Sequence, residues 1–133
     1  MFRCPIQIHG GVLREPVGPQ WLRQCGIEFG RVVRINLNCT KITDDGLKHL
    51  NNLTDFQKLL LYDTEITDDG LEHLDSLNNL QKLWLEDTRI SDEGLKHLRS
   101  LESLKALTLY GTEVTEDGVK MLQESLPNCK IGR

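Results

Sequence analysis

Residues 66–74 read Ile-Thr-Asp-Asp-Gly-Leu-Glu-His-Leu, and this stretch decides the fold because it recurs along the chain. Similar copies occupy residues 42–50, 90–98 and 114–122. The glycine of each copy lies 24 residues after the one before, at Gly46, Gly70, Gly94 and Gly118. A fixed period of about 20–29 residues predicts a solenoid, in which each unit buries its apolar face against its neighbours.

Apolar residues upstream of each copy keep the same period and predict one strand per unit. They are Ile35, Leu59, Leu83 and Leu107, followed two residues later by Leu37, Leu61, Leu85 and Leu109. Polar residues alternate with them in the first unit, which is the two-residue period of a strand with one buried face. A threonine or serine followed by two acidic residues then marks the start of a helix. We therefore expect helices that begin just after Thr43, Thr67, Ser91 and Thr115.

One unit reads Leu80-x-x-Leu83-x-Leu85-x-x-Thr88-x-Ile90, and on this pattern the chain resembles the leucine-rich repeat family. The resemblance is to bacterial proteins built from serial I-T-D-x-G-L units and to the ribonuclease-inhibitor-like class. A threonine stands in each unit where many members of the family carry asparagine. The resemblance implies a right-handed α/β solenoid, or horseshoe, with a parallel sheet on the concave side and short helices on the convex side. It also implies a protein-binding scaffold without catalysis.

The organisation that we predict has two parts. Residues 1–31 do not match the repeat, and we expect them to cap its open N-terminal end. Pro19 can open a short helix over residues 20–24 of this cap, with loose residues at the very start. Residues 32–133 should form the leucine-rich repeat domain, with four repeats of 24 residues plus a C-terminal cap. Cys129-Lys130-Ile131 should start a fifth strand that covers the end.

Bulk properties exclude several classes of function. The formal net charge is −4 and the isoelectric point about 5.5, with no broad basic face, so we expect no nucleic-acid partner. No apolar run approaches the roughly 18 residues of a membrane span, and the start lacks an apolar signal region, which predicts a cytoplasmic protein. Cys4, Cys25, Cys39 and Cys129 form no C-x-x-C pair. We expect Cys25 and Cys129 to be small buried apolar residues.

Residue types that could carry chemistry recur with the repeat, which favours structural roles. The acidic pairs are Asp44-Asp45, Asp68-Asp69 and Asp92-Glu93, and we interpret them as helix caps copied by duplication. His49, His73 and His97 lie on successive helices, whose axes are about 8–10 Å apart, too far for most zinc ligand pairs. They should fill space between helices. We therefore expect no enzyme, no catalytic residue, no metal site and no cofactor.

The candidate binding site is the concave side of the sheet. Residues between the buried leucines face this side and differ from repeat to repeat. The predicted protein-binding residues are Lys58, Leu60, Tyr62, Lys82, Trp84, Glu86, Thr108 and Tyr110. Leu60, Tyr62, Trp84 and Tyr110 should place apolar area on a face that folding does not require to be apolar, as in interfaces. The alternative is that such side chains only stabilise the sheet through cross-strand pairs.

Two functions follow from this interpretation. The first is a monomeric, non-enzymatic protein–protein interaction module that binds a protein partner through the concave sheet surface. The second is a small structural accessory subunit that docks into a larger assembly through its cap or its helical side. Exposed apolar area around Trp84 favours the first, and an uncovered patch around Phe2, Ile6, Ile8 and Trp21 favours the second.

Overall fold

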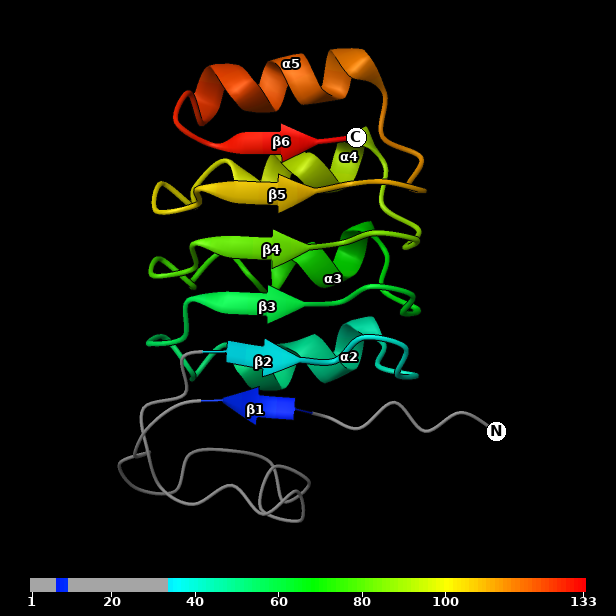
Figure 1. Cartoon of the computed structure of the whole chain (residues 1–133), viewed down its shortest axis with the longest axis vertical. Coiled ribbons are helices and arrows are strands. Elements are labelled where there is room, and N and C mark those ends of the chain that lie inside the picture. The colour runs from blue at the N-terminus through cyan, green and yellow to red at the C-terminus, as the bar shows by residue number, and fades with distance from the viewer. Residues whose placement is uncertain (1–6, 10–33) are drawn as a thin grey trace.

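The computed structural model describes residues 7–9 and 34–133, which form one six-stranded sheet with helices on one side (Figure 1). Five strands run parallel and follow one another in the order of the chain, and β1 pairs antiparallel with β2. Their bounds are β1 Gln7–His9, β2 Arg34–Asn36, β3 Lys58–Leu60, β4 Lys82–Trp84, β5 Ala106–Thr108 and β6 Lys130–Gly132. The chain rises from unit to unit as a right-handed coil, as connections between parallel strands nearly always do (Figure 1).

Each helix begins at the residue that follows the predicted cap. The helices are α2 Asp44–Leu47, α3 Asp68–Glu72, α4 Asp92–Leu95 and α5 Glu116–Ser125, and short 3₁₀ turns, η1 Lys48–Leu50 and η2 Lys96–Leu98, extend α2 and α4. In Figure 1, α2, α3 and α4 lie behind the sheet and α5 lies above β6 at the C-terminal end. The predicted solenoid of strand, turn and short helix is confirmed.

The core lies between the sheet and the helices. The eight upstream apolar residues that define the strand pattern are at most 2% exposed. Each strand of the repeat ends one residue before the second apolar residue of its predicted pair, which is Leu37, Leu61, Leu85 or Leu109. Backbone pairing continues beyond them nevertheless, since Leu61 N–H donates to Trp84 O (2.9 Å) and Asp63 N–H donates to Glu86 O (3.0 Å). The ordered ladder therefore reaches the residues at the strand ends.

A threonine fixes the turn after each strand. Thr64 Oγ1 donates to Leu61 O (2.8 Å), and Thr40, Thr88 and Thr112 make the same bond to the carbonyl three residues earlier. The residue before each threonine has a positive φ, at Cys39, Asp63, Asp87 and Gly111. The left-handed backbone costs little for glycine and is tolerated best by aspartate and asparagine among the other residues. The threonine hydroxyl thus gives the last carbonyl before each turn a hydrogen-bond donor, and at Leu37 and Leu109 the backbone N–H of the same threonine also donates (3.3 Å).

The first acidic residue of each pair does more than the predicted capping. Asp68 Oδ1 accepts Ser91 N–H (2.8 Å) and Asp68 Oδ2 accepts the Ser91 hydroxyl (2.6 Å), across adjacent repeats. Asp44 holds Thr67, and Asp92 holds Thr115, in the same way. We call this contact the aspartate clamp. The clamp does not exclude capping, because the clamped Ser91 and Thr115 hydroxyls also accept Glu93 N–H (3.3 Å) and Gly118 N–H (3.2 Å). The Thr43 and Thr67 side chains accept no capping hydrogen bond.

The glycine of the repeated stretch makes room for the clamp. A Cβ atom on Gly118 would overlap the Asp92 carboxylate, and one on Gly70 or Gly94 would overlap the Asp44 or Asp68 carboxylate of the repeat before. A Cβ atom on Gly46 would instead meet Ile42 of its own repeat. From the second repeat onward, the glycine is therefore required by the aspartate 26 positions earlier in the chain.

The two ends of the described chain differ in how well they were predicted. The fifth parallel strand is confirmed as β6, and Gln123 Nε2 donates to Leu126 O (2.8 Å) and Cys129 O (2.9 Å) where the chain returns from α5. Cys129 is buried, as predicted. Residues 7–9, inside the predicted N-terminal cap, form β1, which was not predicted, and the loose residues expected at the very start lie outside the described residues. Cys25, the predicted helix at 20–24 and the boundary at residue 31 lie outside the described residues.

Candidate functional site

The side of the sheet that faces away from the helices carries all eight predicted binding residues. Because Leu59, Leu61, Leu83 and Leu85 point into the core, the alternating residues on either side of them point the opposite way. We call this side the sheet face. Its rows follow the strand register, in which Lys58 pairs with Lys82 and Leu60 with Trp84 on the next strand. The hydrogen-bond ladder carries the same register to Tyr62 and Glu86.

Two tyrosines supply the exposed apolar surface of the sheet face. Tyr62 is 36% exposed and Tyr110 is 53% exposed. Among the described residues one other large apolar side chain is exposed, Met121 on α5, at 44%. The Tyr110 ring lies over Gly132 of β6, where a Cβ atom would approach the tyrosine hydroxyl to 3.1 Å. The absence of a side chain at Gly132 therefore gives Tyr110 its place on the sheet.

The exposure of Leu60 differs from what the sequence predicted. It is 3% exposed, so the expectation that it adds exposed apolar area is wrong. It does not belong to the core cluster between sheet and helices. On the sheet face it stands beside Trp84, about 4.8 Å away in the strand register, and Trp84 is only half-buried. We infer that the indole covers Leu60, which gives Trp84 a part in stabilising the sheet as well as an exposed edge.

Thr108 stands on the other side of Trp84 in the same row. Its hydroxyl is buried and has no hydrogen-bond partner among the described residues. A buried hydroxyl without a partner costs free energy. Leu60, Trp84 and Thr108 form a partly buried centre, and the two exposed tyrosines lie two residues further along the strands.

Charged side chains border this centre at both strand ends. Lys58 is half-buried and Lys82 exposed where β3 and β4 begin, whereas Asp63 and Asp87 are exposed where the same strands have ended. The negative charge of Asp87 raises the pKa of Tyr62, and partial burial and the charge of Asp63 add to the effect. Tyr62 therefore stays neutral at physiological pH and sits at the acidic edge of the face.

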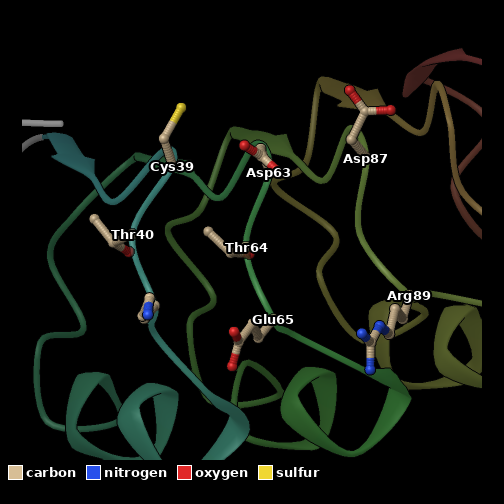
Figure 2. Close-up of a pocket in the computed structure, with 8 residues that line it drawn as sticks. Cys39, Thr40, Asp63, Thr64, Glu65, Asp87 and Arg89 are labelled. Carbon is tan, nitrogen blue, oxygen red and sulfur yellow. The ribbon is translucent and has the colours of Figure 1, made fainter. Parts of the chain in front are cut away.

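A polar pocket of about 400 Å³ opens at this acidic edge (Figure 2). In Figure 2, Asp63 and Asp87 follow one another on successive turns, and Glu65 and Arg89 lie nearer the helices. The pocket is lined by Cys39, Thr40, Lys41, Asp63, Thr64, Glu65, Asp87 and Arg89. The sequence prediction did not include Lys41, Glu65 and Arg89. They share one position of the 24-residue period, where charge changes from repeat to repeat, and that variation is the signal that could have identified them.

Among residues 34–133 the histidines and cysteines do not converge on one site. His49 is exposed and His73 and His97 are half-buried, and no three His, Cys, Asp or Glu side chains of this range are placed to hold a metal ion. Asp75 has a raised pKa because of its partial burial, and the nearby His97 opposes that rise. Burial raises the pKa of the Cys129 thiol to about 11, which makes it a poor nucleophile. No helix in the described part of the chain has the length and apolarity to cross a membrane.

Comparison with known proteins bears on the fold. No protein-family model and no curated protein matches the sequence. Among solved structures, a leucine-rich repeat protein of Leptospira interrogans is similar over 77% of this chain, with 20% identity and a TM-score of 0.62. An internalin of Listeria monocytogenes is similar over 77% of the chain, with 20% identity and a TM-score of 0.52. The matched region spans 25% and 34% of those two chains, so both are much longer proteins.

The repeated stretch, the parallel ladder and these two structures agree with one another. At 20% identity the similarity concerns the fold and carries no ligand or partner with it. The chain has the fold of a leucine-rich repeat protein, a right-handed α/β solenoid with its parallel sheet on the concave side and its helices on the convex side.

Proposed function

We propose that the protein is a non-enzymatic interaction module that binds a protein partner through the sheet face. The observation that carries the proposal is the pair of exposed tyrosines, Tyr62 and Tyr110, on the side of the sheet that does not face the core. Tyrosine and tryptophan are enriched among the anchor residues of interfaces because they bury a large area at a low entropic cost. Around them lie Lys58, Lys82 and Glu86, the charged rim that such interfaces usually have.

The rim and the centre should contribute differently. Charged side chains at the edge speed encounter and set orientation more than they add affinity. The tyrosines should supply most of the binding energy, with Trp84 contributing through its exposed edge. Leu60 contacts the partner little in this proposal, since it is already covered.

The test compares partner capture by matched surface variants. The protein is immobilised and exposed to lysate of its source organism, and captured proteins are quantified by mass spectrometry. Tyr62→Ala together with Tyr110→Ala should reduce capture of a specific partner by more than about tenfold. Met121→Ala and Lys48→Ala, which change exposed residues on the helical side, serve as controls and should leave capture unchanged. Thermal midpoints measured in parallel show whether every variant stays folded.

The outcomes separate the two candidate functions. A partner lost with the tyrosines and kept by both controls supports the sheet face. A partner lost with Met121 or Lys48 and kept by the tyrosine variant would mean that the helical side docks into an assembly. The proposal fails if the captured proteins are the same for all variants.

A further inference from the structure

The charges on the sheet face have a two-sided arrangement. Lys58 and Lys82 stand at the start of their strands, with Arg34 and Lys130 in the same register row. Asp63 and Asp87 stand at the other end of β3 and β4, next to Tyr62 and Glu86. Tyr62 lies four residues after Lys58, about 13 Å at roughly 3.3 Å per residue, and Asp63 follows it in a turn with positive φ, so the two columns are roughly 13 Å apart or slightly more. The aromatic residues lie between them.

This spacing matches an α-helix that lies across the strands. A helix with its side chains is about 10–12 Å wide, which fits between the two columns. Its turns repeat every 5.4 Å, close to the roughly 4.8 Å between strands, so successive turns can meet successive strands. Tyr62 and Tyr110 are two strands apart, about 9.6 Å, close to the two helical turns that join residues i and i+7. In an extended segment, side chains on the same side repeat about every 6.6–6.8 Å, which does not match the spacing between strands over three strands.

We propose that the sheet face binds an amphipathic helix of the partner protein, with an acidic flank over Lys58 and Lys82 and a basic flank along Asp63 and Asp87. The inference rests on the proposed function and specifies the class of partner. Apolar residues at i, i+3 or i+4, and i+7 of the helix contact Tyr62, Trp84 and Tyr110, as in other helix-in-groove complexes. A long basic side chain on the second flank reaches the polar pocket lined by Asp63 and Asp87.

The same arrangement sets the direction of the bound helix. Turning a helix end for end on the sheet exchanges its two flanks, so an acidic and a basic flank allow one direction only. Two flanks of one sign would leave half of the contacts repulsive in either direction. Such like-charge contacts are a common source of specificity between partners.

Three stapled helical peptides of about 15 residues test the proposal. All carry the same apolar stripe, and their flanks are glutamate and lysine, glutamate on both sides, or lysine on both sides. Binding is measured by fluorescence anisotropy at about 50 mM salt, where surface charges are weakly screened. The two-sided peptide should bind the wild-type protein about tenfold tighter than either one-sided peptide. Raising the salt to about 0.5 M should remove most of this difference.

Charge reversal on the protein provides a second and more specific test. In a Lys58→Glu, Lys82→Glu variant both edges are acidic, so the peptide with lysine on both flanks should become the tightest binder. Lys48→Glu with Lys120→Glu makes the same change in net charge on the helical side and should leave the order of the three peptides as in wild type. Tyr62→Ala with Tyr110→Ala should weaken all three peptides, because the apolar stripe loses its anchors.

The result also distinguishes this inference from the function on which it rests. Equal binding of the three peptides, or an equal response to both charge reversals, overturns the helix proposal. If no peptide binds but partner capture still depends on Tyr62 and Tyr110, the sheet face binds a protein in another form and the helix proposal alone is wrong. If capture is also independent of the tyrosines, both are wrong.

Discussion

Replacing Gly118 with alanine should destabilise the protein, but the same replacement should stabilise it once Asp92 has been removed. A Cβ atom added to Gly118 overlaps the Asp92 carboxylate and no other side chain among its three nearest atoms. The clash forces the carboxylate away from Thr115, whose N–H and hydroxyl it accepts at 2.8 and 2.6 Å. Overpacking of this kind costs about 1–3 kcal/mol.

In a protein that already carries Asp92→Ala, Gly118→Ala should be stabilising because of helix propensity. Gly118 lies inside α5, where alanine is more favourable than glycine by about 0.5–1 kcal/mol. With Asp92→Ala the carboxylate is gone, so only this favourable effect remains. Asp92→Ala alone should cost about 1–3 kcal/mol, because two hydrogen bonds to a charged acceptor are lost at a partly exposed site. The coupling energy between the two substitutions should therefore be about 1–3 kcal/mol.

Urea unfolding of the wild type, the two single variants and the double variant, followed by circular dichroism, measures this coupling. Gly46→Ala is the matched control, because its Cβ atom meets Ile42 of its own repeat, and it should add to Asp92→Ala without coupling. If Gly118→Ala costs the same with and without Asp92, to within about 0.5 kcal/mol, the aspartate clamp does not explain the glycine.

Four further predictions rest on single features. The Thr115 hydroxyl and N–H lower the pKa of Asp92. The stabilisation by the Asp92 carboxylate is therefore complete above the ordinary carboxyl pKa and is lost as the pH falls through the lowered pKa of the folded protein. The stability difference between wild type and Asp92→Ala should shrink below about pH 4. Burial and a pKa of about 11 should make Cys129 unreactive in the folded protein, so Cys129→Ser should remove only a slowly reacting thiol in a disulfide-exchange assay at pH 8. Leu83→Ala, at a fully buried position, should cost about 2–5 kcal/mol in one cooperative unfolding transition, and a cost below about 1 kcal/mol would show that Leu83 is not core. Trp84→Ala should lower the free energy of unfolding by about 1–2 kcal/mol because it uncovers Leu60. Tyr110→Ala should change the free energy of unfolding by less than about 0.5 kcal/mol. Equal costs for the two variants would show that the indole does not cover Leu60.

The repeat made most of the fold predictable. Leucines two residues apart specify a strand with one buried face, and four copies in step specify the parallel register of all four strands. The start of each helix was predictable to the residue, because a hydroxyl followed by two acidic residues occurs where a helix must begin. Residues 7–9 lie outside the repeat, and their antiparallel pairing with β2 had no periodic signal.

The aspartate clamp was harder to predict because a local pattern had two explanations. Asp68 after Thr67 is a normal choice for the first turn of a helix, so the cap explained it without any contact to Ser91 in the next repeat. The same difficulty affects Leu60, whose exposure depends on a tryptophan 24 residues away. Alternation predicts which side of a strand a residue faces, but its neighbours on that side decide how much of it water reaches.

The four repeats also serve as an internal comparison that bears on the sheet face. Core positions, the threonine of the turn and the clamp are filled by the same kinds of residue from repeat to repeat, because each unit meets nearly the same neighbours. The sheet face meets equally regular neighbours, yet the row through Leu60 contains asparagine, leucine, tryptophan and threonine in turn. Stability alone would favour the same residue type in all four repeats. The irregular row is what the proposed function requires, since a bound partner need not itself repeat every 24 residues.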